Sequence, residues 1–211
     1  MRPVLAMAAM VLLVWASPPV TAEEKGKVVR IAVLVGNNEG LPSHLPLKYA
    51  EEDARRMRKV LVESGGFAED NIWLLTGGSP AELRKVLDDV AGALSGKAEG
   101  VRPIVLFYYS GHSDGVSLEM GAEVFPFSGV RKWMEGCGAT VSIAVVDACL
   151  SGDLIAMKGM KAAPEFNLDV EGDLRTEGLV ILTASMMGEM AQENEMLGGA
   201  VFTHHLVSGL Y

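Results

Sequence analysis

The chain has 211 residues, of which 27 are acidic and 18 are basic, so its formal net charge is −9 at pH 7. An acidic chain of this kind lacks the basic surface that nucleic acids require, and we expect no nucleic-acid partner. Its length and its 49% of hydrophobic residues suit one globular domain with a sizeable core.

The first 22 residues have the pattern of a signal peptide. Arg2 supplies a short positive region, an apolar run covers 4–16, and small residues at 20–22 resemble a cleavage site. The run is shorter than the roughly 20 residues that a membrane helix needs, which disfavours the alternative of a retained anchor. We therefore expect a signal peptide at 1–22, a mature domain at 23–211, and export to the periplasm or the extracellular space without a stable membrane span.

Strands and helices alternate along the mature chain. Apolar residues predict strands at 28–35 and 71–75, and a stripe of apolar residues spaced by three and four predicts a helix between them at 47–61. Ser79 and Glu82 form the pattern of a capping box, with proline at the first helical position, and this predicts the start of the next helix.

The second half of the chain continues this alternation. The predicted elements are strands at 104–109, 141–146 and 179–183, a hairpin at 116–127, a short helix capped by Ser128, and a final helix at 202–210. The polar stretch 151–178 lacks sustained periodicity and is too long for a simple connection, which is typical of a functional loop. Continuously apolar strands that alternate with helices predict an α/β fold, an open and mainly parallel sheet with helices on both faces.

Two polar loops follow predicted strands at the same relative position. His112 lies three residues beyond strand 104–109, and Cys149 lies three residues beyond strand 141–146. Binding sites in open parallel sheets form at the carboxyl ends of the strands, and neighbouring strands are about 4.8 Å apart. An imidazole and a thiol that meet there can perform nucleophilic catalysis, in which the imidazole moves protons and the thiolate attacks a carbonyl carbon.

The other cysteine, Cys137, precedes the strand that Cys149 follows. About 25 Å of extended chain would separate the two, whereas a disulfide needs Cα atoms within about 7 Å. We therefore expect no disulfide. The alternative to a catalytic role is that Cys149 is a small buried residue and His112 an ordinary loop residue with satisfied hydrogen bonds.

The motifs "YYSGHSDG" (108–115) and "VVDACLSG" (145–152) resemble the histidine and cysteine motifs of the caspase and metacaspase cysteine proteases, especially exported bacterial members. The order of strands and helices is similar to the caspase-like fold too. The resemblance implies an endopeptidase without a metal or another cofactor, with His112 as general acid and base and Cys149 as nucleophile. Backbone N–H groups of Cys149 and Ser113 would hold the oxyanion, although the family usually has glycine where Ser113 stands.

The resemblance also implies a pocket, S1, for the substrate residue before the cleaved bond, P1. Asp147, Ser110 and Asp53 match positions that line S1 in metacaspases, and carboxylates pair well with basic side chains. We therefore expect cleavage of protein or peptide substrates after Arg or Lys. For Asp53 an ordinary solvent-exposed helix charge is an alternative, because four charged residues surround it.

The stretch 151–178 corresponds to a linker that proteins of this family often cleave in themselves. Lys158, Lys161 and Arg175 are accordingly predicted self-cleavage sites. Calcium activation is not expected, because no acid-rich insert lies between the two motifs, and His44 has no evident partner for a metal site.

Two further expectations concern the whole chain. It stops earlier than the resemblance suggests, so the domain is expected to be C-terminally incomplete or to complete its sheet as a homodimer. The alternative function is an inactive caspase-like pseudo-protease that serves as a binding or scaffolding module, which the serine at Ser113 would favour.

Overall fold

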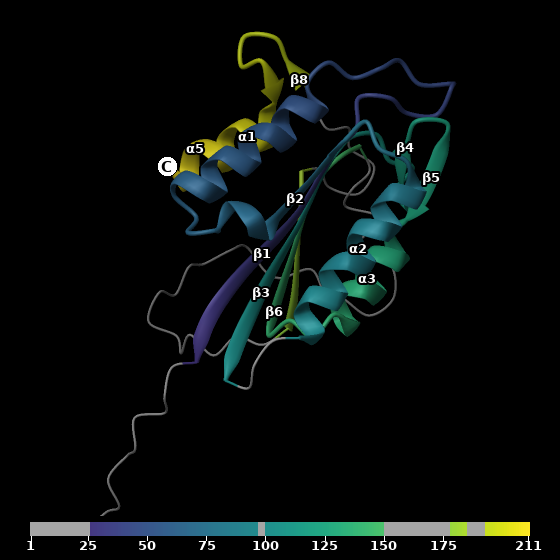
Figure 1. Cartoon of the computed structure of the whole chain (residues 1–211). Coiled ribbons are helices and arrows are strands. Elements are labelled where there is room, and N and C mark those ends of the chain that lie inside the picture. The colour runs from purple at the N-terminus through teal and green to yellow at the C-terminus, as the bar shows by residue number, and fades with distance from the viewer. Residues whose placement is uncertain (1–25, 97–99, 150–177, 185–192) are drawn as a thin grey trace, which may run out of the picture.

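The computed structural model of the chain describes residues 26–96, 100–149, 178–184 and 193–211. Its centre is a sheet of five parallel strands in the order β2-β1-β3-β6-β7 (Figure 1). The strands are β1 (Lys27–Gly36), β2 (Ile72–Thr76), β3 (Val101–Ser110), β6 (Val141–Asp147) and β7 (Gly178–Thr183). The predicted parallel sheet and its five strands are confirmed, with strand ends shifted by a few residues.

Helices cover both faces of this sheet. Figure 1 shows α1 and α5 together on one side and α2 and α3 on the other. The helices are α1 (Ala50–Glu63), α2 (Pro80–Ser95), α3 (Phe127–Gly136) and α5 (Val201–Leu210), with a 3-10 turn at Glu69–Asn71. Because both faces are buried, the buried parts of the central strands are runs of apolar residues, such as 31–35 in β1 and 104–109 in β3, rather than alternately polar.

Strand β1 shows how one segment serves two layers of core. Ile31, Val33 and Val35 pack into the cluster that contains α2 and α3, whereas Ala32 and Leu34 pack into the cluster of α1 and α5. All five side chains are at most 1% exposed. Successive side chains of a strand point to opposite faces, and each buried Val, Leu or Ile stabilises the fold by about 1.5–3 kcal/mol. Burial on both faces thus fixes the strands in place, and the strands in turn position the loops at their carboxyl ends.

Two antiparallel hairpins lie at that carboxyl end (Figure 1). One joins β4 (Ser117–Met120) to β5 (Glu123–Pro126), and the other joins β8 (Glu193–Asn194) to β9 (Gly199–Ala200). The first confirms the hairpin predicted at 116–127. The second was not predicted, because strands of two residues carry no periodic signal.

The helix starts predicted from the sequence agree with the structure less well than the predicted strands do. The capping box at Ser79 is confirmed: its N–H donates to the Glu82 carboxylate (2.8 Å), and its Oγ accepts from the Glu82 N–H (3.3 Å). Helix α1 begins at Ala50, later than predicted. Ser128 lies inside α3 rather than at its cap, so that prediction was wrong. The first helical residue is Phe127, whose N–H donates to the carbonyl of Val116, the residue before β4 (3.1 Å).

Candidate active site

The ends of β3 and β6 bring the two predicted motifs together. Ser110 pairs with Asp147 in the sheet register, and the N–H of Gly111 donates to the Asp147 carbonyl (3.2 Å). His112 and Cys149 therefore leave neighbouring strands two residues beyond the same pair. One pocket contains both motifs; it is lined by Leu47, Ser110, Gly111, His112, Asp147, Cys149, Glu193 and Ala200. The prediction that the two motifs meet at one edge of the sheet is confirmed.

The imidazole of His112 is half-buried and held in one orientation. Its Nε2 lies 2.9 Å from the carbonyl oxygen of Leu45, in the loop between β1 and α1. A carbonyl oxygen only accepts, so Nε2 carries the proton and Nδ1 of the neutral ring has the lone pair. Gly40 packs against the ring, and a Cβ there would lie 2.6 Å from Cδ2 of His112. The loop after β1 thus fixes both the position and the tautomer of the ring.

The cysteines agree with the sequence prediction, since neither forms a disulfide. Cys137 is buried, whereas Cys149 is half-exposed and lines the pocket. Ser113 is 5% exposed and pairs with Leu118 through an isolated bridge. The bond of this bridge runs from the Glu119 N–H to the His112 carbonyl, and the Ser113 N–H donates no hydrogen bond to the described part of the chain. A donor is therefore available one residue after His112.

Asp147 ends β6 as a buried acid at the pocket. It is 3% exposed, and its Oδ2 accepts hydrogen bonds from Oγ1 (2.7 Å) and from the N–H (3.2 Å) of Thr203. Burial raises the pKa of Asp147 to about 6, against the lowering effect of the Thr203 bonds. Ser110, 3% exposed, lies beside it on β3. Two of the three predicted S1 residues, Asp147 and Ser110, therefore line the pocket.

Asp53 lies deeper than either reading of the sequence suggested. It is 0% exposed, so the interpretation as an exposed helix charge is wrong. Its Oδ2 accepts from the N–H of Ala200 (2.9 Å), a lining residue, while Asp53 itself does not line the pocket. Burial, with a smaller contribution from Asp147, raises the pKa of Asp53 to about 7, although the Ala200 bond lowers it. Asp53 thus supports the pocket from behind β9.

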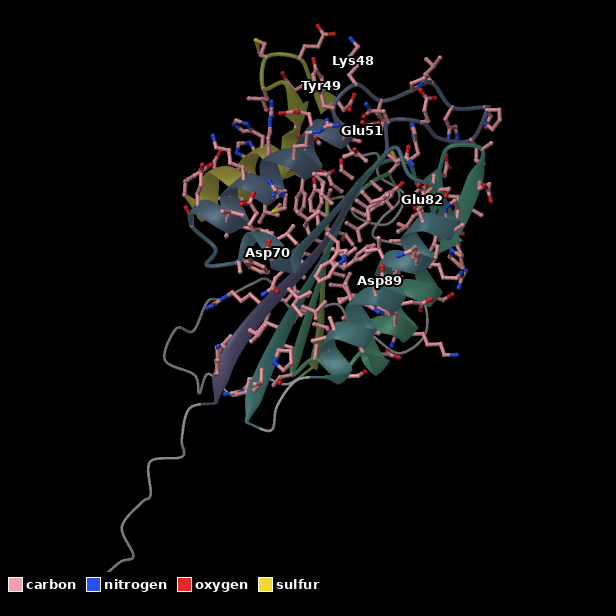
Figure 2. All side chains as sticks on the ribbon, viewed as in Figure 1. Lys48, Tyr49, Glu51, Asp70, Glu82 and Asp89 are labelled. Carbon is pink, nitrogen blue, oxygen red and sulfur yellow. The ribbon has the colours of Figure 1, made fainter. Side chains whose placement is uncertain are left out.

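Sequence reasoning missed one acid of the pocket, Glu193 on β8. Its carboxylate accepts from the N–H groups of Lys48 (3.1 Å) and Tyr49 (2.8 Å), which directly precede α1. Figure 2 shows Lys48 and Tyr49 at that end of α1, next to β8. The bonds join residues more than 140 positions apart, and Glu193 lies in no motif, so no local pattern could have revealed it.

Several sequence predictions fall outside this part of the structure. Lys158, Lys161 and Arg175 lie outside the described residues, as do 1–22. Among the residues that are described, no helix is long and apolar enough to cross a membrane.

Comparison with known proteins identifies the family. A family model described as the caspase domain matches residues 29–210, nearly the whole chain. No curated protein sequence matches. The fold is similar to that of caspase-1 from Spodoptera frugiperda, with a TM-score of 0.59 and 16% identity over 89% of this chain and 71% of that chain. The chain belongs to the caspase-domain family, a family of cysteine peptidases, and has a caspase-like fold.

Proposed function

We propose that this chain is a cysteine endopeptidase in which Cys149 is the nucleophile and His112 the general acid and base. The observation that carries the proposal is the pocket that both side chains line. Nδ1 of His112 takes the thiol proton, and the sulfur attacks the carbonyl carbon of the substrate. As the C–N bond breaks, the imidazolium returns a proton to the leaving amine. Water, activated by the same ring, then hydrolyses the thioester and releases the acid.

The backbone N–H groups of Ser113 and Cys149 are proposed to hold the oxyanion of the tetrahedral intermediate. Such donors stabilise the charge that develops on the carbonyl oxygen as the sulfur attacks. In support, the Ser113 N–H donates no bond within the described residues. A serine at this position therefore keeps the donor that the reaction needs.

The S1 pocket is proposed to select Arg or Lys at P1. Asp147, Ser110 and Glu193 line the pocket, and Asp53 lies behind it. When ionised, these carboxylates give the pocket a negative charge that a guanidinium or ammonium group would compensate, whereas an acidic P1 side chain would be repelled.

Three broader proposals accompany this one: self-cleavage at Lys158, Lys161 or Arg175, export after removal of 1–22, and a homodimer. The homodimer is supported by β7, the last strand of the described sheet, which exposes Val180 and Leu182 by 41% and 39%. N-terminal sequencing of the secreted chain and light scattering of the purified one would test export and pairing.

The test of the peptidase uses matched fluorogenic peptides that differ only in P1, as Arg, Lys, Asp or Ala. We expect cleavage after Arg and Lys by the wild-type chain and none by Cys149→Ala. The intact mass of both preparations reports self-cleavage, which only the wild type should show. Cleavage after Asp would keep the dyad and refute the S1 proposal. No cleavage of any peptide would favour the pseudo-protease alternative, a binding or scaffolding module.

A further inference from the structure

His112 also belongs to a second group of polar side chains. His44, His112 and Glu119 each offer one ligand atom, and these atoms all lie within 4.8 Å of one another. His44 comes from the loop after β1 and Glu119 from β4. Nδ1 of His44 is 2.8 Å from Oε2 of Glu119, and the two histidine rings lie 5.1 Å apart between centroids. The expectation that His44 has no partner was therefore wrong.

Glu119 has a feature that its own contacts do not explain. Its side chain is 0% exposed, and Oε2 accepts from the Leu41 N–H (2.9 Å) in addition to facing His44. Oε1 is buried and has no hydrogen-bond partner among the described residues. A buried carboxylate oxygen without a partner is costly, and such groups pair with a cation or bind a metal. Glu119 thus brings one unsatisfied carboxylate oxygen to the group that contains the two imidazoles.

We propose that His44, His112 and Glu119 bind one divalent transition-metal ion of the Zn²⁺ class. Two imidazoles and one carboxylate form a known ligand set for zinc, whereas Ca²⁺ and Mg²⁺ prefer oxygen ligands only. Ligand atoms about 2.0–2.2 Å from a tetrahedral ion are about 3.3–3.6 Å from one another. The present spacing reaches that geometry through small shifts of the ligands: His44 and Glu119, now 2.8 Å apart, separate slightly, and atoms as far as 4.8 Å apart approach each other. The loop that carries His44 is exposed and allows such a shift.

The arrangement of these three side chains also gives the ion a path from solvent to the site and explains how the charge of the buried Glu119 carboxylate is compensated. The His44 side chain is 42% exposed, so solvent reaches the cluster from its side. The ion displaces the proton shared between His44 and Glu119, and its positive charge stabilises the buried carboxylate.

The ion inhibits the peptidase, and this part of the inference rests on the proposed function. A neutral imidazole has a single lone pair. If the metal binds Nδ1 of His112, that lone pair is occupied. If it binds Nε2, the Leu45 bond is lost and the ring proton moves to Nδ1. In both cases His112 cannot accept the proton of Cys149.

Binding is tested without reference to activity. The Cys149→Ser variant, which lacks the reactive thiol, is titrated with Zn²⁺ by calorimetry and with Co²⁺ by visible absorption. We expect one ion per chain. His44→Ala and Glu119→Gln should weaken binding by more than about tenfold, since even the loss of an outer-shell partner costs about 10–100-fold. His204→Ala, a histidine on α5, is the control and should bind normally. His44 is exposed, so its replacement leaves the fold intact even if Glu119→Gln does not fold.

Inhibition is then measured on chains with Cys149, each normalised to its own rate without metal. We expect Zn²⁺ to inhibit the wild type, and His44→Ala to need more than about tenfold more Zn²⁺ for the same inhibition. Inhibition that is unchanged in His44→Ala would show that the thiol alone binds the ion. Absence of binding to Cys149→Ser, or binding unaffected by His44→Ala, overturns the site. If no peptide is cleaved at all, the proposed function fails while the binding titration still decides the site.

Discussion

At the scale of single residues, the burial of Asp147 and Asp53 favours their neutral, protonated forms, whereas the proposed recognition of a basic P1 side chain requires their ionised forms. Burial raises their pKa values to about 6 and about 7, so near neutral pH each carries only part of its charge. Under the proposed S1 specificity, a basic P1 side chain would be held by the ionised form of these carboxylates. Protons and a basic substrate would then compete for the same two groups.

We predict a specificity that depends on pH. The ratio of kcat/KM for P1 Arg to that for P1 Ala should rise as the pH increases through the interval from about 6 to about 7, because the carboxylates ionise there. Taking a ratio removes the titration of the dyad, which both substrates share.

The first matched variant for this measurement is Asp147→Asn, which should lower the ratio and flatten its pH profile. The control is Asp70→Asn, in the 3-10 turn that precedes β2 and not among the residues that line the pocket (Figure 2). A ratio independent of pH in the wild type would contradict ionised S1 carboxylates as the basis of selectivity.

At the scale of elements, α1 and α5 lack caps from their own side chains. Carboxylates that are distant in the sequence accept hydrogen bonds at the starts of these two helices instead. Glu193 accepts from the N–H groups that precede α1, and Asp147 accepts from the N–H of Thr203 in the first turn of α5. Negative charge at a helix N-terminus is stabilising. The acids of the pocket therefore also orient the two helices on one face of the sheet.

The link between the pocket acid Asp147 and helix α5 is best measured by replacing Thr203. Its Oγ1 donates to Asp147 and accepts from the hydroxyl of Tyr108 (2.6 Å), and its side chain is 0% exposed. Thr203→Val keeps the shape and removes the hydroxyl bonds to Asp147 and Tyr108, while the backbone N–H of residue 203 still donates to Asp147. We expect a loss of about 1–3 kcal/mol in the free energy of unfolding, measured with urea.

The control is Thr203→Ser, which keeps the hydroxyl and loses only a methyl group, and which should be more stable than Thr203→Val. If the valine variant proves as stable as the serine variant, the hydroxyl does not anchor α5 to the sheet.

At the scale of the whole molecule, the sequence was sufficient for the sheet and for the meeting of His112 with Cys149. Those features rest on local periodicity and on a general rule about strand ends. The partners of the site could not be predicted in this way, because His44 and Glu119 are 75 residues apart and the Asp53–Ala200 bond spans 147. No local pattern reports such pairs.

Asp53 is an instructive intermediate case. It lies three residues after Ala50 and four before Met57, which is the spacing of the buried face of α1. The charged residues around it concealed this signal, and the burial of Asp53 could have been inferred from the spacing alone.

The burial of Asp53 has a consequence for global stability. Its pKa is about 7 in the folded chain and close to 3.8 when unfolded, so the folded state binds the proton more tightly. The contribution of Asp53 to the stability of the folded state should therefore fall as the pH rises from about 4 to about 7. At pH 8, Asp53→Asn should be more stable than the wild type by about 1–3 kcal/mol, and the difference should shrink toward pH 5.

Urea unfolding at several pH values measures this effect, with Glu52→Gln, half-exposed on the same helix, as a control without it. An Asp53→Asn variant less stable than the wild type at pH 8 would mean that the interactions of the ionised carboxylate outweigh its desolvation.

The hydrogen bonds that join Asp53 to Ala200 and Asp147 to Thr203 can form only late in the synthesis of the chain, after residues 200 and 203 have been added. A ribosome produces β1, β3 and β6 first, and domains begin to fold during synthesis. A growing chain that has reached Cys149 already contains both proposed catalytic side chains, whereas Glu193 and Ala200 of the proposed S1 pocket are still missing. Under the proposed function, the ability to select a substrate arises only after Ala200 and Thr203 have been translated, so a growing chain that ends before them lacks this selectivity.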